Sequence, residues 1–115
     1  HYANMLDLKL NIEVRGLIKL SNLVEENVYR MIQEALNNTK KHAQTNHVSI
    51  NIQQNEHQLY IKIYDDGKGF NVRDDLNQTT HGLKNIKQRI HSLDGEFNIQ
   101  SDKLMGTTIY LNIPI

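Results

Sequence analysis

Three side chains of different chemistry lie on one side of a predicted helix. Glu34, Asn38 and Lys41 follow one another at spacings of four and three residues, which places them within about 60° of one another around the helix axis. A carboxylate can accept or orient a proton, an amide oxygen is a hard ligand suited to Mg²⁺, and an ammonium group can meet phosphate. Taken alone, this row is more typical of a solvated helix flank.

A second polar string, Asp65-Asp66-Gly67-Lys68-Gly69, directly follows an alternating apolar run and therefore stands where a strand ends. A fixed carboxylate at Asp65 can accept a hydrogen bond from the amino group of adenine, but it would repel the carbonyl oxygen of guanine. Gly67 and Gly69 allow the backbone to approach a flat ring. Turns with two glycines are common, so this string alone is a weak signal.

The helix that carries the first row has a clear core face. Ser21 or Asn22 could cap its N-terminus, and Glu25 and Glu26 lie in the first turn, where negative charge complements the helix dipole. Apolar or small side chains recur along it at spacings of three and four residues, the pattern of a one-sided stripe. They are Val24, Val28, Ile32, Ala35, Leu36, Thr39 and Ala43.

Alternating apolar residues predict the strands. The first, over residues 6–15, is expected to be buried on one face through Leu6, Leu8, Leu10, Ile12 and Val14. Residues 48–52 and 59–63 form a predicted hairpin, with Tyr60 and Tyr64 on the opposite face from the isoleucines. Residues 97–99 and 107–113 form another.

A second helix is predicted to open at Gly82 and to end at Gly95 as a helix-terminating glycine. Its stripe is Leu83, Ile86, Ile90 and Leu93. Its first turn offers unpaired N–H groups to phosphate oxygens. Together these elements predict an α+β fold, a two-layer sandwich in which helices cover one face of a mixed, mostly antiparallel sheet.

The composition indicates one domain over residues 1–115. The chain has no cysteine, so a disulfide framework and a thiolate metal site are excluded. The 13 basic and 13 acidic residues balance, which argues against a nucleic-acid surface. No apolar window is long enough to insert into a membrane. Residues 1–5 could be the remnant of a preceding helix, and we expect the chain to be a piece of a longer protein.

Four motifs occur in a fixed order: E-x-x-x-N on a helix, D-x-G-x-G after a strand, Gly-Leu opening a second helix, and Gly-Thr-Thr entering the last strand. This order resembles the Bergerat-type ATP-binding fold, which includes sensor histidine kinases, gyrase and mismatch-repair ATPases, and the ninety-kilodalton heat-shock chaperones. The fuller strings EALNNTKKHA, DDGKGF, HGLKNIKQRI and GTTIYLNIPI resemble the catalytic domain of histidine kinases of the nitrate-sensor and desaturase-sensor type. The resemblance covers roughly residues 16 to 115.

The resemblance implies roles for the residues of the helical row. Glu34 would be the catalytic residue that helps activate the attacking group, and Asn38 would coordinate Mg²⁺. Lys41 would meet phosphate. His42 is a further candidate for the nucleotide site, with a packed histidine as the alternative.

The resemblance also implies an adenine slot and a phosphate-binding helix start. Asp65 would read adenine, and Gly67 and Gly69 would shape the slot. Thr107 would support Asp65 through its hydroxyl, directly or through water, unless it only fills the strand. The Gly82-Leu83 pair would face the phosphates. One departure concerns Thr80, which stands where many relatives have a glycine, so Thr79 and Thr80 could supply hydroxyl contacts instead.

The function implied is binding of Mg²⁺-ATP and transfer of its γ-phosphoryl group to a histidine on a separate dimerisation domain, with a response regulator downstream. None of the six histidines has the context of a phosphoacceptor. The resemblance also implies a cytoplasmic domain that is a monomer by itself, within a homodimeric parent. The alternatives are a serine kinase of the anti-sigma type or another ATPase of this fold, and a non-catalytic nucleotide-binding module.

Overall fold

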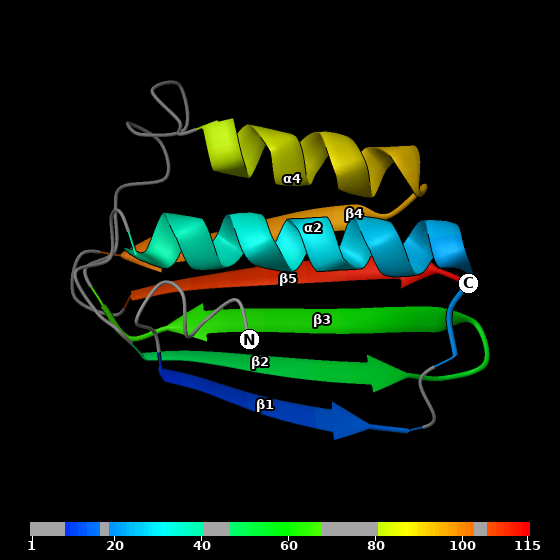
Figure 1. Cartoon of the computed structure of the whole chain (residues 1–115), viewed down its shortest axis with the longest axis horizontal. Coiled ribbons are helices and arrows are strands. Elements are labelled where there is room, and N and C mark those ends of the chain that lie inside the picture. Colours follow the sequence, from blue (N-terminus) through cyan, green and yellow to red (C-terminus); the bar gives the residue numbers. More distant parts are fainter. Residues whose placement is uncertain (1–8, 17–18, 41–46, 68–80, 103–105) are drawn as a thin grey trace.

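The computed structural model describes residues 9–16, 19–40, 47–67, 81–102 and 106–115. The described helices and strands follow one another along the chain (Figure 1): β1 (Lys9–Arg15), α2 (Asn22–Asn38), β2 (His47–Gln54), β3 (Gln58–Asp65), α4 (His81–Ser92), β4 (Glu96–Asp102) and β5 (Gly106–Pro114). Within these ranges, no helix is long and apolar enough to cross a bilayer.

The strands form one sheet of five, in the order β1-β2-β3-β5-β4. β1 runs parallel to β2, whereas the pairs β2 with β3, β3 with β5 and β4 with β5 are antiparallel. The two predicted hairpins are therefore confirmed as β2–β3 and β4–β5. The sheet is mixed and mostly antiparallel, as the sequence predicted.

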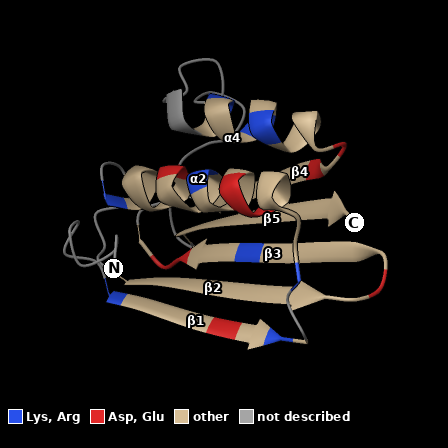
Figure 2. Ribbon diagram, turned by 45° about the vertical axis from the view of Figure 1, so that its right-hand side comes forward, with Lys and Arg blue, Asp and Glu red and all other residues tan. Residues whose placement is uncertain are grey.

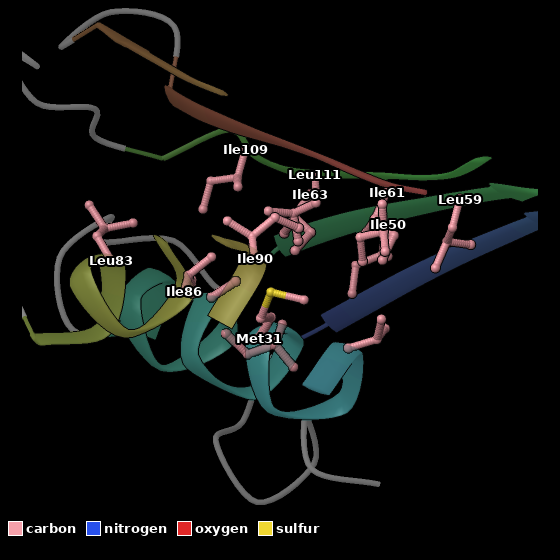
Figure 3. Packing of buried hydrophobic residues seen from close by; sticks show 14 of the residues in the cluster. Met31, Ile50, Leu59, Ile61, Ile63, Leu83, Ile86, Ile90, Ile109 and Leu111 are labelled. Carbon is pink, nitrogen blue, oxygen red and sulfur yellow. The ribbon is translucent and has the colours of Figure 1, made fainter. Parts of the chain in front are cut away.

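The core lies between the sheet and the two helices. Figure 3 shows Met31 of α2 and Ile86 and Ile90 of α4 directed towards the isoleucines and leucines of the sheet. Every second residue of β3 and of β5 contributes to this layer because side chains alternate across a strand. The buried hydrophobic residues are Val28, Met31, Ala35, Leu36, Val48, Ile50, Leu59, Ile61, Ile63, Leu83, Ile86, Ile90, Ile109, Leu111 and Ile113. The predicted two-layer α+β sandwich is confirmed.

Local capping sets both ends of α2. The Ser21 hydroxyl accepts a hydrogen bond from the Val24 N–H at 3.3 Å, so Ser21 is the N-cap, one of the two candidates that the sequence offered. The regular helix ends at Asn38, and the N–H of Thr39 then donates to the carbonyls of Ala35 and Leu36. The predicted apolar stripe runs on to residue 43, but residues 41–43 lie outside the described ranges.

The end of α4 corrects one prediction. Gly95 was expected to be the left-handed residue that terminates the helix, but that conformation belongs to Asp94, whose φ is 57°. Gly95 matters for another reason: a Cβ there would lie 2.7 Å from the Asn112 carbonyl oxygen of β5. Its N–H donates to the Ile90 carbonyl at 2.8 Å. Gly95 therefore allows the chain to pass close to β5 as it enters β4.

The edge strand β1 corrects another prediction. Ile12 and Val14 were expected to be buried, yet their side chains are 55% and 52% exposed. The register pairs Ile12 with Ile50, which puts it on the helix side of the sheet. Figure 1 shows why it is nevertheless open: β1 lies at the edge of the sheet farthest from both helices. Alternation gave the correct face but not the position of the strand within the sheet.

The second face of the sheet carries polar and aromatic side chains and no described helix. Tyr60 and Tyr64 lie there, as predicted, and the Lys62 ammonium sits 5.9 Å from the centre of the Tyr110 ring. A shallow hollow of about 570 Å³ follows this face. Figure 2 shows acidic and basic residues interspersed along the described elements, in keeping with the balanced charge.

Candidate functional site

The Asp65 carboxylate is the best-defined polar group of the predicted site. Asp65 is the last residue of β3 and points to the helix side, where it is only 6% exposed. Its Oδ1 accepts a hydrogen bond from the Gly67 N–H at 3.2 Å, and the N–H of Thr107 also donates to the carboxylate. The hydroxyl of Thr39 lies 3.5 Å from Oδ2. Three separate segments therefore meet at one buried carboxylate.

Opposing effects act on the pKa of Asp65. Burial is the larger effect and raises the pKa of Asp65 above 3.8, because it disfavours the charged form. The N–H groups of Gly67 and Thr107 and the Thr39 hydroxyl act in the other direction, since they stabilise the anion. The neighbouring Asp66 carboxylate adds to the increase. The net result is a raised pKa, at a group held by the surrounding structure.

Thr107 supports Asp65 in a different way from the predicted one. The two residues face each other in the β3–β5 register, and Thr107 is buried. Its backbone N–H reaches the carboxylate, whereas its hydroxyl lies 2.8 Å from the hydroxyl of Ser101 on β4. The predicted contact of the Thr107 hydroxyl through water stays a prediction.

The structure requires a glycine at position 106, where the last strand begins. Its φ of 81° lies in the left-handed region, and a Cβ there would overlap the backbone oxygen of Asp65. The start of β5 can approach the end of β3 only because this residue has no side chain. That approach brings the Thr107 N–H to the carboxylate.

Thr39 is a site residue that the sequence reasoning missed. It was counted in the apolar stripe of the helix, and it is indeed 3% exposed. Its hydroxyl donates to the Ala35 carbonyl at 3.1 Å and also reaches Asp65. A polar residue within an otherwise apolar stripe was the available signal, because a buried hydroxyl needs a hydrogen-bond partner.

Glu34 and Asn38 lie one turn apart on α2, and both are half-buried. Asn27 belongs to the same row, since seven residues make two turns. The Asn27 side chain accepts a hydrogen bond from Arg89 of α4 at 3.2 Å, so this row faces the α4 side. Asn38 directly precedes Thr39, which brings the row to the end of α2 where Asp65 lies.

The remaining predicted residues divide into two groups. Gly82 and Leu83 lie in the first turn of α4, and the Leu83 side chain is buried in the core. A contact of Gly82 or Leu83 with a ligand would therefore involve their backbone N–H groups. The residues that fall outside the described ranges are Lys41, His42, Gly69, Thr79 and Thr80. Within those ranges, no three His, Cys, Asp or Glu side chains form a metal-binding group.

The fold and this arrangement correspond to a known family of ATPases. Residues 23–115 match the family model described as histidine kinase-, DNA gyrase B-, and HSP90-like ATPase. The match covers most of the chain, so the chain belongs to this family and is an ATP-binding domain. The resemblance inferred from the four motifs is confirmed.

Two proteins with similar sequences carry the name of histidine kinases. The signal transduction histidine-protein kinase/phosphatase DegS of Brevibacillus brevis is 38% identical over 92 residues, which cover 80% of this chain and 24% of DegS. The oxygen sensor histidine kinase NreB of Staphylococcus carnosus is 37% identical over 97 residues, covering 84% of this chain and 28% of NreB. The chain therefore spans about a quarter of the length of these relatives.

Solved structures agree on the fold. The Acinetobacter baumannii histidine kinase AdeS superposes with a TM-score of 0.79 at 16% identity, over 98% of this chain and 57% of that one. The histidine kinase domain of the blue-light activated kinase EL346 from Erythrobacter litoralis gives a TM-score of 0.76 at 20% identity, over 97% and 57%. At these identities the superpositions support the fold.

Proposed function

We propose that this chain is the catalytic domain of a sensor histidine kinase. It binds Mg²⁺-ATP and transfers the γ-phosphoryl group to a histidine on a separate dimerisation domain. The observation that carries this proposal is the buried Asp65 carboxylate, held by the Gly67 and Thr107 N–H groups and the Thr39 hydroxyl. The family match and the sensor-kinase relatives supply the reaction class.

The donors around Asp65 favour an adenine ligand. Among the described residues, no Lys, Arg or His forms an ion pair with this carboxylate. Two oxygens have about four acceptor sites, and three protein donors leave capacity for one more. An exocyclic amino group fills that position, whereas a carbonyl oxygen would be repelled. Gly67 and, on the resemblance, Gly69 would then shape the slot beside the ring.

The row on α2 fits the phosphate end of the nucleotide. The Asn38 amide oxygen would be the protein ligand of Mg²⁺, an ion that commonly keeps waters and phosphate oxygens as its other ligands. Such a site needs no cluster of three carboxylates or imidazoles. Lys41, His42 and the first-turn N–H groups of α4 at Gly82 and Leu83 would meet the phosphates.

In the proposed reaction an imidazole nitrogen attacks the γ-phosphorus. The bond from that phosphorus to the β–γ bridging oxygen breaks, a phosphorus–nitrogen bond forms, and ADP leaves. Glu34 would accept or orient the proton of the attacking imidazole. Bound Mg²⁺ would neutralise charge on the phosphates. The histidine domain, a response regulator, a homodimeric parent and a cytoplasmic setting are further parts of the proposal.

Label transfer tests the proposal. The chain is incubated with Mg²⁺ and γ-labelled ATP, alone and with the dimerisation domain of its own parent. We expect no stable label on the chain alone and acid-labile, base-stable label on the added domain. Acid-stable label would point to the serine-kinase alternative. Nucleotide binding without any label on a folded acceptor domain would favour the non-catalytic module.

The role of Asn38 can be tested by binding alone. Asn38→Ala should weaken Mg²⁺-ATP far more than metal-free ADP, because the partner of Asn38 is the metal and not the base. Asn37→Ala is the matched control, since it removes the same amide one position earlier on α2. Equal losses for both nucleotides in Asn38→Ala would contradict its assignment as the metal ligand.

A further inference from the structure

The hydroxyl of Thr39 sits between two acceptors. Its Oγ1 lies 3.1 Å from the carbonyl oxygen of Ala35 and 3.5 Å from Oδ2 of Asp65. One hydroxyl carries one hydrogen, so at any moment it donates fully to one acceptor or is shared between both. Thr39 is 3% exposed, which leaves bulk water little access to compete for that hydrogen.

The two acceptors differ in their need for this hydrogen. A threonine that donates to the carbonyl four residues earlier is a common local arrangement in helices. Here the Ala35 carbonyl already accepts from the backbone N–H of Thr39 itself. Asp65 carries a buried charge, and its Oδ2 gains a stronger, charge-assisted hydrogen bond. The carboxylate therefore gains more from this hydrogen than the Ala35 carbonyl does, even though Ala35 is the nearer acceptor.

The donors to Asp65 come from different directions. The Gly67 N–H reaches Oδ1 from the residues just after β3, and the Thr107 N–H comes from β5. Thr39 approaches Oδ2 from the end of α2. A carboxylate held from three segments has little freedom to rotate, so the oxygen lone pairs that remain have a fixed direction.

We propose that Thr39 is a positioning residue for adenine recognition, whose buried hydroxyl orients the Asp65 carboxylate towards the amino group of the base. This inference rests on the proposed nucleotide site. Thr39 does not itself contact the nucleotide. Thr39 directly follows Asn38. Its hydrogen bond therefore connects the carboxylate that would read the base to the end of α2, where Asn38 would bind the metal.

The experiment measures binding of two nucleotides that differ by one group. ATP carries the amino group that Asp65 would read, whereas purine riboside triphosphate lacks it. Thr39→Val removes the hydroxyl and keeps the branched shape. We expect Thr39→Val to bind ATP about tenfold more weakly, the effect of losing one hydrogen bond to a charged group, and to bind purine riboside triphosphate as wild type does. Thr39→Ser should restore ATP binding.

The matched control is Thr108→Val, which makes the same exchange one residue after Thr107, where alternation directs the side chain to the other face of the sheet. It should leave the affinities of both nucleotides unchanged. Equal weakening of both nucleotides in Thr39→Val would show a merely structural role and overturn the inference, as would unchanged ATP binding. If Thr39→Val does not fold, as judged by thermal melting, the pair Thr39→Ser and Thr39→Ala makes the same comparison.

Binding of the two nucleotides by the wild type shows whether a failed test concerns Thr39 alone or the proposed nucleotide site as well. If it prefers ATP to purine riboside triphosphate while Thr39→Val retains the whole preference, Asp65 still reads the base and the Thr39 inference alone is wrong. If the wild type binds both nucleotides equally, the assignment of Asp65 is wrong and the role of Thr39 falls with it.

Discussion

The two faces of β3 share one backbone but lie in different environments: one is buried under the helices and the other is open. On the helix side, Leu59, Ile61 and Ile63 are buried and the series ends in Asp65, which is buried as well. On the open side, Tyr60 and Tyr64 are 40% and 37% exposed. A charge at the end of an apolar series costs free energy unless it is hydrogen-bonded, whereas a tyrosine hydroxyl on the open face can bond water.

This difference separates residues that serve folding from a residue that, in the proposed function, serves binding. Apolar side chains at the first three helix-side positions stabilise the sandwich. Burial of the Asp65 charge at the fourth such position costs free energy, and hydrogen bonds from Gly67, Thr107 and Thr39 offset part of that cost. A buried carboxylate held by three donors is thus the point on β3 where the sequence departs from simple packing, as expected of the proposed binding site. Substitutions on the helix side and on the open side should therefore differ both in the property that they change and in the size of the change.

The largest effect is expected at Glu34 in the helix layer. Glu34→Gln should leave nucleotide affinity within about threefold but slow phosphoryl transfer by roughly 10² to 10⁴, the range for a lost general base. The measurement is labelling of the histidine domain at saturating ATP. Glu96→Gln makes the same exchange at an exposed residue on the open face and should transfer at the wild-type rate. Wild-type transfer by Glu34→Gln would remove Glu34 from the mechanism.

The second largest effect is expected at Asp65, the last residue of β3 on the helix side. Asp65→Asn should weaken ATP binding on the order of 10²-fold or more and reduce the preference for ATP over GTP, because a site built to pair with one group discriminates strongly. Calorimetric titration with both nucleotides measures this. Tyr64→Phe alters the neighbouring residue on the open side and should change neither affinity. Equal binding of ATP and GTP by the wild type would contradict the adenine assignment.

Much of this two-sided strand could be predicted from sequence, and the reason is physical. Alternation along β3 gave its inner and outer faces and put Asp65 where the strand ends, because side chains on a strand alternate with period two. Helical spacing likewise placed Glu34 and Asn38 on one row. These are local regularities of the backbone, so they can be read without knowing what packs against them.

Other features depend on contacts between distant segments. Periodicity assigned Thr39 to the core face of α2 but could not show that Asp65, from another element, would meet its hydroxyl. Alternation likewise gave no information that β1 is an edge strand, which left Ile12 and Val14 exposed. The site roles of Glu34 and Asn38 stay predictions, because they concern a ligand and not the fold.

A smaller effect is expected when one small group is removed on each side of β3. Ile63→Val removes one buried methylene group and should lower the free energy of unfolding by about 0.5 to 1.5 kcal/mol. Tyr60→Phe removes an exposed hydroxyl and should change it by no more than about 0.5 kcal/mol. Chemical denaturation of both variants provides the comparison. An equal loss in both would mean that the open face is covered in solution.

The smallest effect concerns the pH dependence of stability at Asp65. Because burial raises its pKa above 3.8, the folded state holds this proton more tightly than the unfolded state. The unfolded state then binds fewer protons, so the contribution of Asp65 to the free energy of unfolding falls as the pH rises from about 3.8 through the raised pKa. The destabilising effect of the buried charge is fully present above that window and absent below it.

Asp65→Asn removes this titration. The difference in unfolding free energy, variant minus wild type, should therefore be larger at pH 7 than at a pH well below 3.8, where the wild-type carboxyl is protonated in both states. Denaturant titrations at several pH values measure it, and Asp94→Asn makes the same exchange at an exposed residue that already adopts the left-handed conformation asparagine tolerates. The opposite slope, with the wild type gaining stability relative to Asp65→Asn as the pH rises, would show that the three donors outweigh burial. The carboxylate would then be a stabilising part of the fold, and the contrast between packing and binding along β3 would be lost.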